Sequence, residues 1–197
     1  MKKIILALAI SLVTFSAAMA QTQPQATPTP PASQPATAAP AGPPADPKDV
    51  ASIDSIMKAV YDVISGDAGK ARDWDRFRSL FHKDARLIPT GKNAQTGVVT
   101  ARSMTPEDYI QRAGPGLVSN GFHEVEKARQ VDLYGNIAQV FSTYESRRTL
   151  KDEKPFIRGI NSFQLLNDGK RWWVVTIYWQ GETPENPIPT QYLKSRN

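Results

Sequence analysis

The hydrophobic residues that follow Asp46 recur every three to four positions, which is the period of a helix. They are Val50, Ile53, Ile56, Met57, Val60 and Ile64. Asp46 is a favourable N-cap residue, Pro47 suits the first helical turn, and Ser65-Gly66 follows the last apolar position. This stretch therefore predicts one amphipathic helix that begins at Pro47 and stops before Gly66.

Two more helices and a short strand are predicted further along the chain. One helix begins at Asp73 and has an apolar stripe made of Trp74, Phe77, Leu80 and Phe81. The segment "ARLIPTG" at 85–91 is typical of a short strand that ends at Pro89. A third helix begins after the cap residue Thr105, and we expect the run Gly114-Pro115-Gly116 to break or bend it.

After Gly121 the sequence changes to β-branched and aromatic runs separated by turns. Four consecutive strands are predicted, at residues 122–133, 137–149, 156–166 and 171–180. The tight connection at 134–136 and the Asp-Gly pair in "NDGK" at 167–170 predict antiparallel hairpins. Helices followed by a meander indicate the α+β class, with a curved antiparallel sheet wrapped around three N-terminal helices.

The last of these runs, "KRWWVVTIYWQGE" at 170–182, holds three of the four tryptophans. Strand alternation places two sets of side chains on opposite faces: Trp173, Val175, Ile177 and Trp179 on one, and Trp172, Val174, Thr176 and Tyr178 on the other. The first set is uniformly apolar, so we expect Trp173 in the core. The second set is suited to a dimer partner, and Trp179 and Gln180 end the strand.

The chain divides into three regions by composition. Residues 1–20 combine Lys2 and Lys3, an apolar run and the ending Ala18-Met19-Ala20, which predicts a signal peptide cleaved after Ala20 and a periplasmic or secreted protein. Residues 21–47 are rich in Pro, Ala and Thr and predict a flexible linker. Residues 48–197 remain as one domain, in which no apolar run is long enough for a membrane span.

Charge and residue types exclude several function classes. The formal net charge of +5 includes Lys2 and Lys3, so signal cleavage leaves about +3, and the basic residues are scattered among acidic ones. We therefore expect no nucleic-acid partner. There is no cysteine, and the two histidines, His82 and His123, stand far apart in the sequence, so no disulfide, metal site or cofactor is predicted.

The order of helix, helix, strand, helix and four long strands resembles the nuclear transport factor 2-like superfamily, which includes SnoaL-like cyclases and ketosteroid isomerases. The segments "FHEVEKARQVDLYGNIAQVFSTYESRR", "RGINSFQL", "DGKRWWVV" and "NPIPTQYL" look like an exported bacterial subfamily without established activity. The resemblance covers residues 48–193. It implies that the curved sheet is cone-shaped, with a pocket between its concave face and the helices and with Trp179 and Gln180 near the mouth of the cone. We expect a homodimer through the sheet.

The resemblance does not carry an isomerase mechanism onto this chain. Isomerase-like members have a stretch similar to "FHKDARLIP" with a carboxylate base directly before the proline, and here that position is Ile88. Isoleucine cannot move a proton. The remaining candidates for a catalytic base are His123 and Glu124; if this segment is a strand, Glu124 and Glu126 share one face and His123 lies on the other.

Polar residues inside apolar strands are candidates for ligand binding, because burying them costs free energy unless they find partners. With the terminal tryptophan of the last strand, the set is Tyr144, Arg147, Arg158, Asn161, Trp179 and Gln180. An antiparallel sheet with one face in water explains the same alternation without a site.

Three hypotheses about function follow. The first is an exported domain that binds a small hydrophobic or amphipathic ligand, or a partner, in the cone. The second is a SnoaL- or dehydratase-like enzyme acting on a small cyclic or carbonyl compound, with His123 or Glu124 as base and Tyr144 or Arg158 as electrophilic support. The third is a structural dimer whose cone is filled by its own side chains. Ile88 favours the first or the third, so we lean away from an enzyme.

Overall fold

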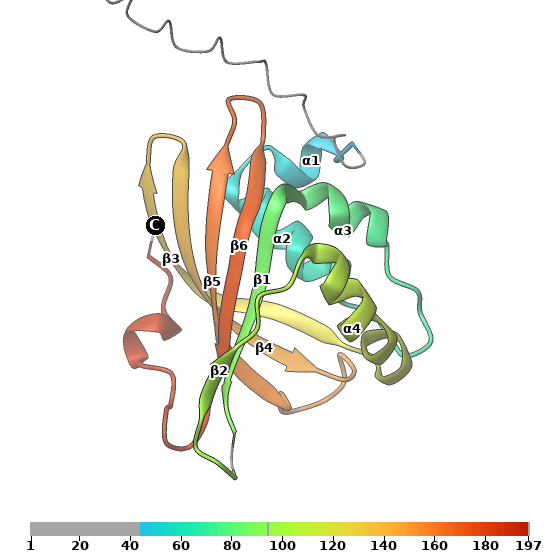
Figure 1. Ribbon diagram of the computed structural model, residues 1–197, viewed down its shortest axis with the longest axis vertical. Helices are drawn as coiled ribbons and strands as arrows, with labels where there is room; N and C mark the ends of the chain where they lie inside the picture. The colour runs from blue at the N-terminus through green and yellow to red at the C-terminus, as the bar shows by residue number, and fades with distance from the viewer. Residues whose placement is uncertain (1–43, 94, 197) are drawn as a thin grey trace, which may run out of the picture. The chain divides into compact units, whose positions relative to one another are not determined.

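A computed structural model describes residues 44–93 and 95–196 (Figure 1). The predicted signal peptide and the linker as far as residue 43 lie outside the described residues. The elements are α1 (Pro47–Val50), α2 (Ile53–Ile64), α3 (Trp74–Leu80), β1 (Phe81–Lys92), β2 (Val99–Ala101), α4 (Pro106–Asn120), β3 (His123–Tyr134), β4 (Ile137–Arg147), β5 (Ile157–Asn167), β6 (Trp172–Gly181) and the 3-10 helix η1 (Thr190–Leu193).

The six strands form one sheet in the order β2-β1-β6-β5-β4-β3, and the helices cover its concave face (Figure 1). Strands β3 to β6 form the predicted antiparallel meander, within a few residues of the predicted bounds. The predicted α+β class and cone shape are therefore confirmed. One pair differs, since β1 runs parallel to β6. These strands are far apart in the sequence, and turn signals predict only pairings between neighbours.

Two predictions about the helices are wrong. The first helix is divided at Ala51-Ser52, because the hydroxyl of Ser52 accepts from the backbone N–H of Ser55 at 3.0 Å and starts α2 as a new N-cap. Four helices therefore replace the predicted three. In addition, α4 continues through Pro115 to Asn120. Gly114 lets α4 approach α3 closely there, since a Cβ at this position would lie 3.1 Å from the indole of Trp74.

A β-bulge in β6 changes which tryptophan is buried. Leu165 pairs with Val174 and Gln164 with Thr176, so Val175 is an extra residue that reverses the alternation. Trp172 is consequently in the core at 8% exposure. Trp173, which strict alternation places in the core, faces outward instead: its Nε1 donates to Asp168 at 2.8 Å, and the guanidinium of Arg171 lies 3.6 Å from its ring centre.

The core fills the space between the helices and the concave face. Its largest fully buried side chains include Phe77, Phe163, Ile56, Met57, Leu80, Leu165, Val140 and Val174. After β6 the chain returns across the outer face of the sheet, where the carbonyl of Tyr192 accepts from Thr143 Oγ1 at 2.6 Å. The end of the chain then pairs with β3, because Arg196 N donates to the carbonyl of Arg129 at 2.7 Å. This segment covers part of the edge of the sheet.

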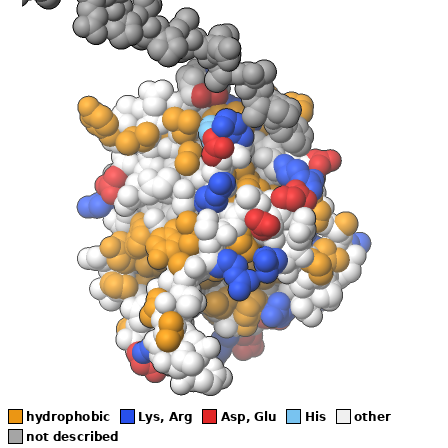
Figure 2. All heavy atoms as spheres, in the orientation of Figure 1, with side chains coloured by type: hydrophobic (Ala, Val, Ile, Leu, Met, Phe, Trp, Pro, Cys, Tyr) orange, Lys and Arg blue, Asp and Glu red, His pale blue; other side chains and the backbone are white. Residues whose placement is uncertain are grey.

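Figure 2 shows basic and acidic side chains interspersed on the visible face of the molecule, with apolar side chains between them. Among residues 44–93 and 95–196, no helix is long and apolar enough to cross a membrane.

Candidate functional site

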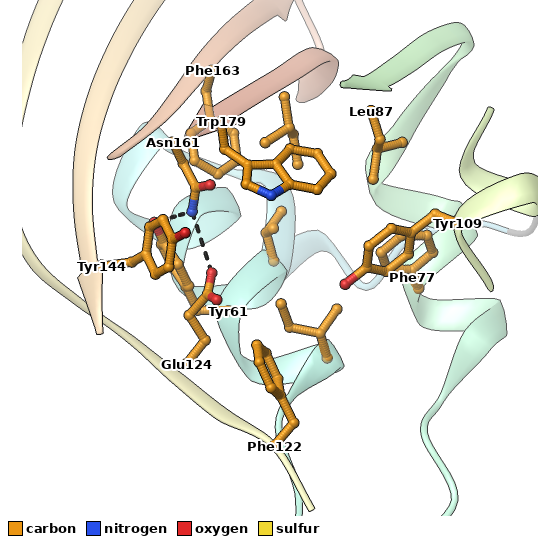
Figure 3. Close-up of a pocket in the computed structure, with 13 residues that line it drawn as sticks. Tyr61, Phe77, Leu87, Tyr109, Phe122, Glu124, Tyr144, Asn161, Phe163 and Trp179 are labelled. Atoms are coloured by element: carbon orange, nitrogen blue, oxygen red, sulfur yellow. Dashed lines mark hydrogen bonds between the residues drawn. The ribbon is translucent and has the colours of Figure 1, made fainter. Parts of the chain in front are cut away.

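A cavity of about 110 Å³ lies between the concave face of the sheet and the helices (Figure 3). Most of its wall is apolar or aromatic, and helices and strands both contribute. The lining residues are Val60, Tyr61, Ile64, Phe77, Leu87, Tyr109, Phe122, Glu124, Tyr144, Asn161, Phe163, Ile177 and Trp179. A concave, mostly apolar space with a few polar groups is the usual form of a small-molecule site.

Glu124 is the only carboxylic acid among the residues that line this cavity. Its Oε2 accepts from Ser146 Oγ at 2.8 Å, and its Oε1 accepts from Asn161 Nδ2 at 3.2 Å. Within the described part of the chain, it forms no ion pair with a Lys, Arg or His side chain. Burial raises the pKa of Glu124 from 4.5 to about 7, although both hydrogen bonds act to lower it. The carboxyl group therefore exists in both protonation states near neutral pH.

Two tyrosine hydroxyl groups in the cavity wall are available to a ligand. Tyr109, from α4, stacks on Phe77 with ring centres 5.5 Å apart, and its hydroxyl points into the cavity from the side opposite Glu124 (Figure 3). Tyr144 comes from β4. Neither hydroxyl has a hydrogen-bond partner among the residues that the structure describes. Burial raises the pKa of both tyrosines, so each keeps its proton and can donate it in a hydrogen bond.

The structure brings four of the sequence-predicted residues together at this cavity: Glu124, Tyr144, Asn161 and Trp179. His123 does not join them, because alternation along β3 turns it away from Glu124. Its Nε2 lies 2.9 Å from Asp67 Oδ1. Of the two candidate bases, the one in the cavity is thus Glu124.

The other predicted residues lie on the outer face of the sheet. Arg147 Nη2 donates to Glu145 at 3.0 Å, and Arg158 lies between Glu145 and Glu182, with its Nε 3.8 and 3.5 Å from their oxygens. Gln180 lines a separate hollow of about 430 Å³ that the outer face forms with the C-terminal segment. Strand alternation explains all three positions, since each residue is an odd number of positions from an inward-facing neighbour.

Two of the cavity's polar residues were not among the predicted site residues. Tyr61 and Tyr109 are carried by α2 and α4, and in the sequence each belongs to the apolar stripe of a helix. The only signal that marks them is a hydroxyl group on an otherwise apolar face.

On β1, Leu87 is the residue that lines the cavity, and Ile88 pairs with Tyr178 on the outer side. Strand β1 therefore supplies no carboxylate to the cavity, and the carboxylic acid in the cavity, Glu124, comes from β3. No group of three or more acidic, His or Cys side chains that could hold a metal ion occurs in the described ranges.

No model of a known protein family matches this sequence, and no curated protein matches it either. Solved structures do match. A protein of unknown function with a cystatin-like fold from Nostoc punctiforme PCC 73102 has 11% sequence identity and a TM-score of 0.50, over 70% of this chain and 92% of that one. LinA has 10% sequence identity and a TM-score of 0.50, over 68% of this chain and 85% of that one. An NTF2-like protein of unknown function from Shewanella baltica OS155 has 17% sequence identity and a TM-score of 0.42, over 66% of this chain and 91% of that one. The TM-scores of 0.50 show that the chain shares the fold of the Nostoc punctiforme protein and of LinA, in keeping with the cone-shaped α+β fold predicted from the sequence, and identities this low establish the fold alone.

Proposed function

We propose that this protein binds a small, mostly apolar molecule in the inner cavity and that one polar group of this molecule hydrogen-bonds to Glu124. The observation that carries the proposal is a carboxyl group buried in an apolar cavity, opposite the Tyr109 hydroxyl, which has no hydrogen-bond partner among the residues that the structure describes. Burying a carboxyl group costs free energy, and the two hydrogen bonds from Ser146 and Asn161 do not offset that cost fully, because the pKa of Glu124 is still raised. A polar group of a ligand offsets that cost.

The size of the cavity limits the ligand. An apolar cavity of ~150 Å³ holds one benzene ring. A cavity of about 110 Å³ therefore suits a molecule with a single small ring or a short branched chain. The open volume also favours ligand binding over a cone that is filled by its own side chains.

The polar groups limit the chemistry of the ligand. An O–H or N–H group of the ligand can donate to the ionised form of Glu124, and a carbonyl oxygen can accept from Tyr109 or Tyr144. A carboxylate ligand is disfavoured, because it places a second negative charge beside Glu124 in an apolar site. Neutral phenols, lactams and small cyclic ketones meet these requirements.

A thermal-shift screen of the mature chain tests the proposal. With phenol, 2-pyrrolidone and cyclohexanone as probes, we expect at least one to raise the Tm, since a ligand at 100-fold its Kd stabilises by about 2.7 kcal/mol. The Ile177→Phe variant fills the cavity and should abolish the shift, whereas Glu182→Gln on the outer face should retain it. A screen without any shift, or a shift that Ile177→Phe leaves unchanged, contradicts the proposal.

A second candidate function is proton transfer on a small carbonyl compound, and the raised pKa of Glu124 favours it. A general base acts best when its pKa is near the working pH, and Tyr109 or Tyr144 can donate to the carbonyl oxygen. The test is exchange of the α-protons of cyclohexanone for deuterium in D2O, followed by NMR. Exchange above the buffer rate should fall at least ~100-fold in Glu124→Gln. A rate equal to that of buffer alone rules this candidate out.

We also propose that the chain is exported and forms a homodimer through the outer face of the sheet. The features of residues 1–20 support export. On the outer face, Tyr178 is 46% exposed, and exposed aromatic side chains are favoured in interfaces. N-terminal sequencing of the secreted protein should give Gln21 as the first residue, and light scattering should give twice the monomer mass.

A further inference from the structure

A line of hydrogen bonds connects Glu124 to a second carboxylate, Glu126, which does not line the cavity. Asn161 Nδ2 lies 3.2 Å from Glu124 Oε1 and 3.1 Å from the hydroxyl of Tyr61. The Tyr61 hydroxyl lies 2.7 Å from Ser142 Oγ, which donates to Glu126 Oε1 at 2.6 Å. Three elements meet in this line, since Tyr61 is on α2, Ser142 on β4 and Asn161 on β5.

The Glu126 end of the line is fixed by an arginine. Arg129 Nε donates to Glu126 Oε2 at 2.9 Å, and its Nη1 donates to Asp54 at 2.6 Å. A carboxylate that is paired with a guanidinium accepts hydrogen bonds and donates none. Glu126 therefore determines the direction of its hydrogen bond with Ser142, in which Ser142 must be the donor.

Each hydroxyl group in the line has one proton, so the first direction sets the others. Ser142 donates its proton to Glu126 and must accept from Tyr61. Tyr61 has then used its own proton and must accept from Asn161. The amide group of Asn161 consequently turns its NH2 toward both Tyr61 and Glu124, and its carbonyl oxygen away from them.

We propose that Glu126 is a positioning residue for the ligand site, because it keeps the NH2 group of Asn161, and not the carbonyl oxygen, directed at Glu124. This inference rests on the proposed function of the cavity and adds how the ligand-accepting state of Glu124 is maintained. If Asn161 turned over, its oxygen would lie within hydrogen-bond distance of a Glu124 oxygen. Two acceptors tolerate that distance only when Glu124 carries a proton.

The positioning role and a simple charge effect predict opposite results. As a second negative charge, Glu126 by itself makes ionisation of Glu124 less favourable, so its removal lowers the pKa of Glu124. As a positioning residue, Glu126 favours the ionised form, so its removal raises that pKa. The sign of the change therefore separates the two roles.

Among the described residues that line the cavity, no other group changes its charge in the pH range of this test. The groups that face it are Tyr61 from α2, Tyr109 from α4 and Tyr144 from β4. Burial raises the pKa of all three tyrosines, so they remain uncharged from pH 4 to 9. The cavity residues contributed by α3, β1, β5 and β6 do not titrate.

The experiment is a pH titration of the Glu124 side-chain carboxyl by 13C NMR in the mature chain, without a ligand. In Glu126→Gln the amide NH2 donates to Ser142, the line of bonds reverses, and we expect the pKa of Glu124 to rise by about one unit. Ser142→Ala breaks the same line without touching Arg129 and should also raise it. Glu126→Asp keeps an acceptor and should restore the wild-type value.

The matched control is Asp54→Asn, which removes a negative charge from the same arginine but lies outside the line of bonds. It should change the pKa of Glu124 by less than ~0.3 units. A lower or unchanged pKa in Glu126→Gln overturns the positioning role, and so does an equal rise in Asp54→Asn. If Glu126→Gln fails to fold, Ser142→Ala decides the question. Because the titration uses no ligand, its outcome is independent of whether the thermal-shift screen finds one.

Discussion

The side chains of Glu124 on β3 and Asn161 on β5 meet at 3.2 Å although β4 lies between their strands. The contact is possible because β4 places small residues beneath them: Ser146 pairs with Glu124, and Ser142 pairs with Asn161. Both serine hydroxyls also donate to carboxylates, Ser146 to Glu124 and Ser142 to Glu126. The sequence of β4 thus creates the space for the site and supplies part of its hydrogen bonding.

The buried carboxyl group should make stability depend on pH. The pKa of Glu124 is about 7 in the folded state against 4.5 as the ordinary value, so between these pH values the folded state binds more protons than the unfolded state. The free energy of unfolding therefore falls as the pH rises through this window, by about 3 kcal/mol in all. The contribution of Glu124 is most favourable below pH 4.5 and is lost above pH 7.

Urea unfolding of the wild type and of Glu124→Gln at pH 5 and pH 8 measures this effect. The side chain at position 124 does not titrate in the glutamine variant. The difference in unfolding free energy between the two proteins should therefore shift by about 2 to 3 kcal/mol in favour of the variant between pH 5 and pH 8. A difference that stays constant between the two pH values shows that Glu124 has an ordinary pKa.

Gly159 on β5 pairs with Tyr144 on β4, and because Gly159 has no side chain it leaves room for the Tyr144 ring. A Cβ at this position would come within 2.6 Å of the Tyr144 hydroxyl and would also clash with the backbone carbonyl of Gln180. We expect Gly159→Ala to cost about 1 to 3 kcal/mol of stability and to displace Tyr144 from the cavity wall.

The neighbouring Gly181, which pairs with Gly159, is the matched control. A Cβ there would lie 3.1 Å from the end of the Ile157 side chain, which can move, and 3.8 Å from the carbonyl oxygen of Arg158, which is an ordinary contact. Gly181→Ala should therefore cost less than ~1 kcal/mol. Equal losses in chemical denaturation of the two variants would show that the contact with Tyr144 has no special cost.

The fold was predictable from the sequence where the signals are local. The four runs after Gly121 and the turns between them gave the meander, and caps at Asp73 and Thr105 gave two helices in their correct places. The parallel β1–β6 pair and the bulge at Val175 were not predictable in this way. A strand pair distant in sequence has no turn signal, and a bulge leaves the residue types of its strand unchanged.

The site was predictable in part for the same reason. Asn161 is a polar residue within an apolar strand, so the cost of burying it marks it in the sequence, whereas Glu124 was a candidate only as a carboxylate that could serve as a base. Tyr61 and Tyr109 belong to helical stripes in which tyrosine is an ordinary core residue. Their role depends on which strand residues face the helices, and that is fixed only by the three-dimensional fold.

The bulge in β6 predicts different roles for two adjacent tryptophans. Trp172 is in the core, so Trp172→Ala should cost about 3 to 5 kcal/mol. Trp173 lies on the outer side beneath Arg171, and its loss should cost about 1 kcal/mol. Chemical denaturation of both variants checks this difference. If Trp173→Ala were the more damaging change, β6 would follow strict alternation without a bulge.

A single buried guanidinium holds the loop between α2 and α3 against α4. Arg72 is 7% exposed, and it donates to four carbonyl oxygens: Ile64 at 2.9 Å, Lys70 at 2.5 Å, Gly66 at 2.6 Å and Leu117 at 2.9 Å. The carbonyls belong to three separate segments of the chain. The planar group of an arginine can reach all of them at once, whereas the single ammonium group of a lysine cannot.

Arg72→Lys should therefore leave buried carbonyl oxygens without a donor and reduce the free energy of unfolding by about 2 to 4 kcal/mol. Arg78→Lys is the control, because Arg78 forms ion pairs with Asp75 and Glu107 at the surface, where such pairs contribute less than ~1 kcal/mol. Urea unfolding at pH 7 compares the two variants. Similar stabilities would mean that water replaces the guanidinium at these carbonyls and that the loop does not depend on Arg72.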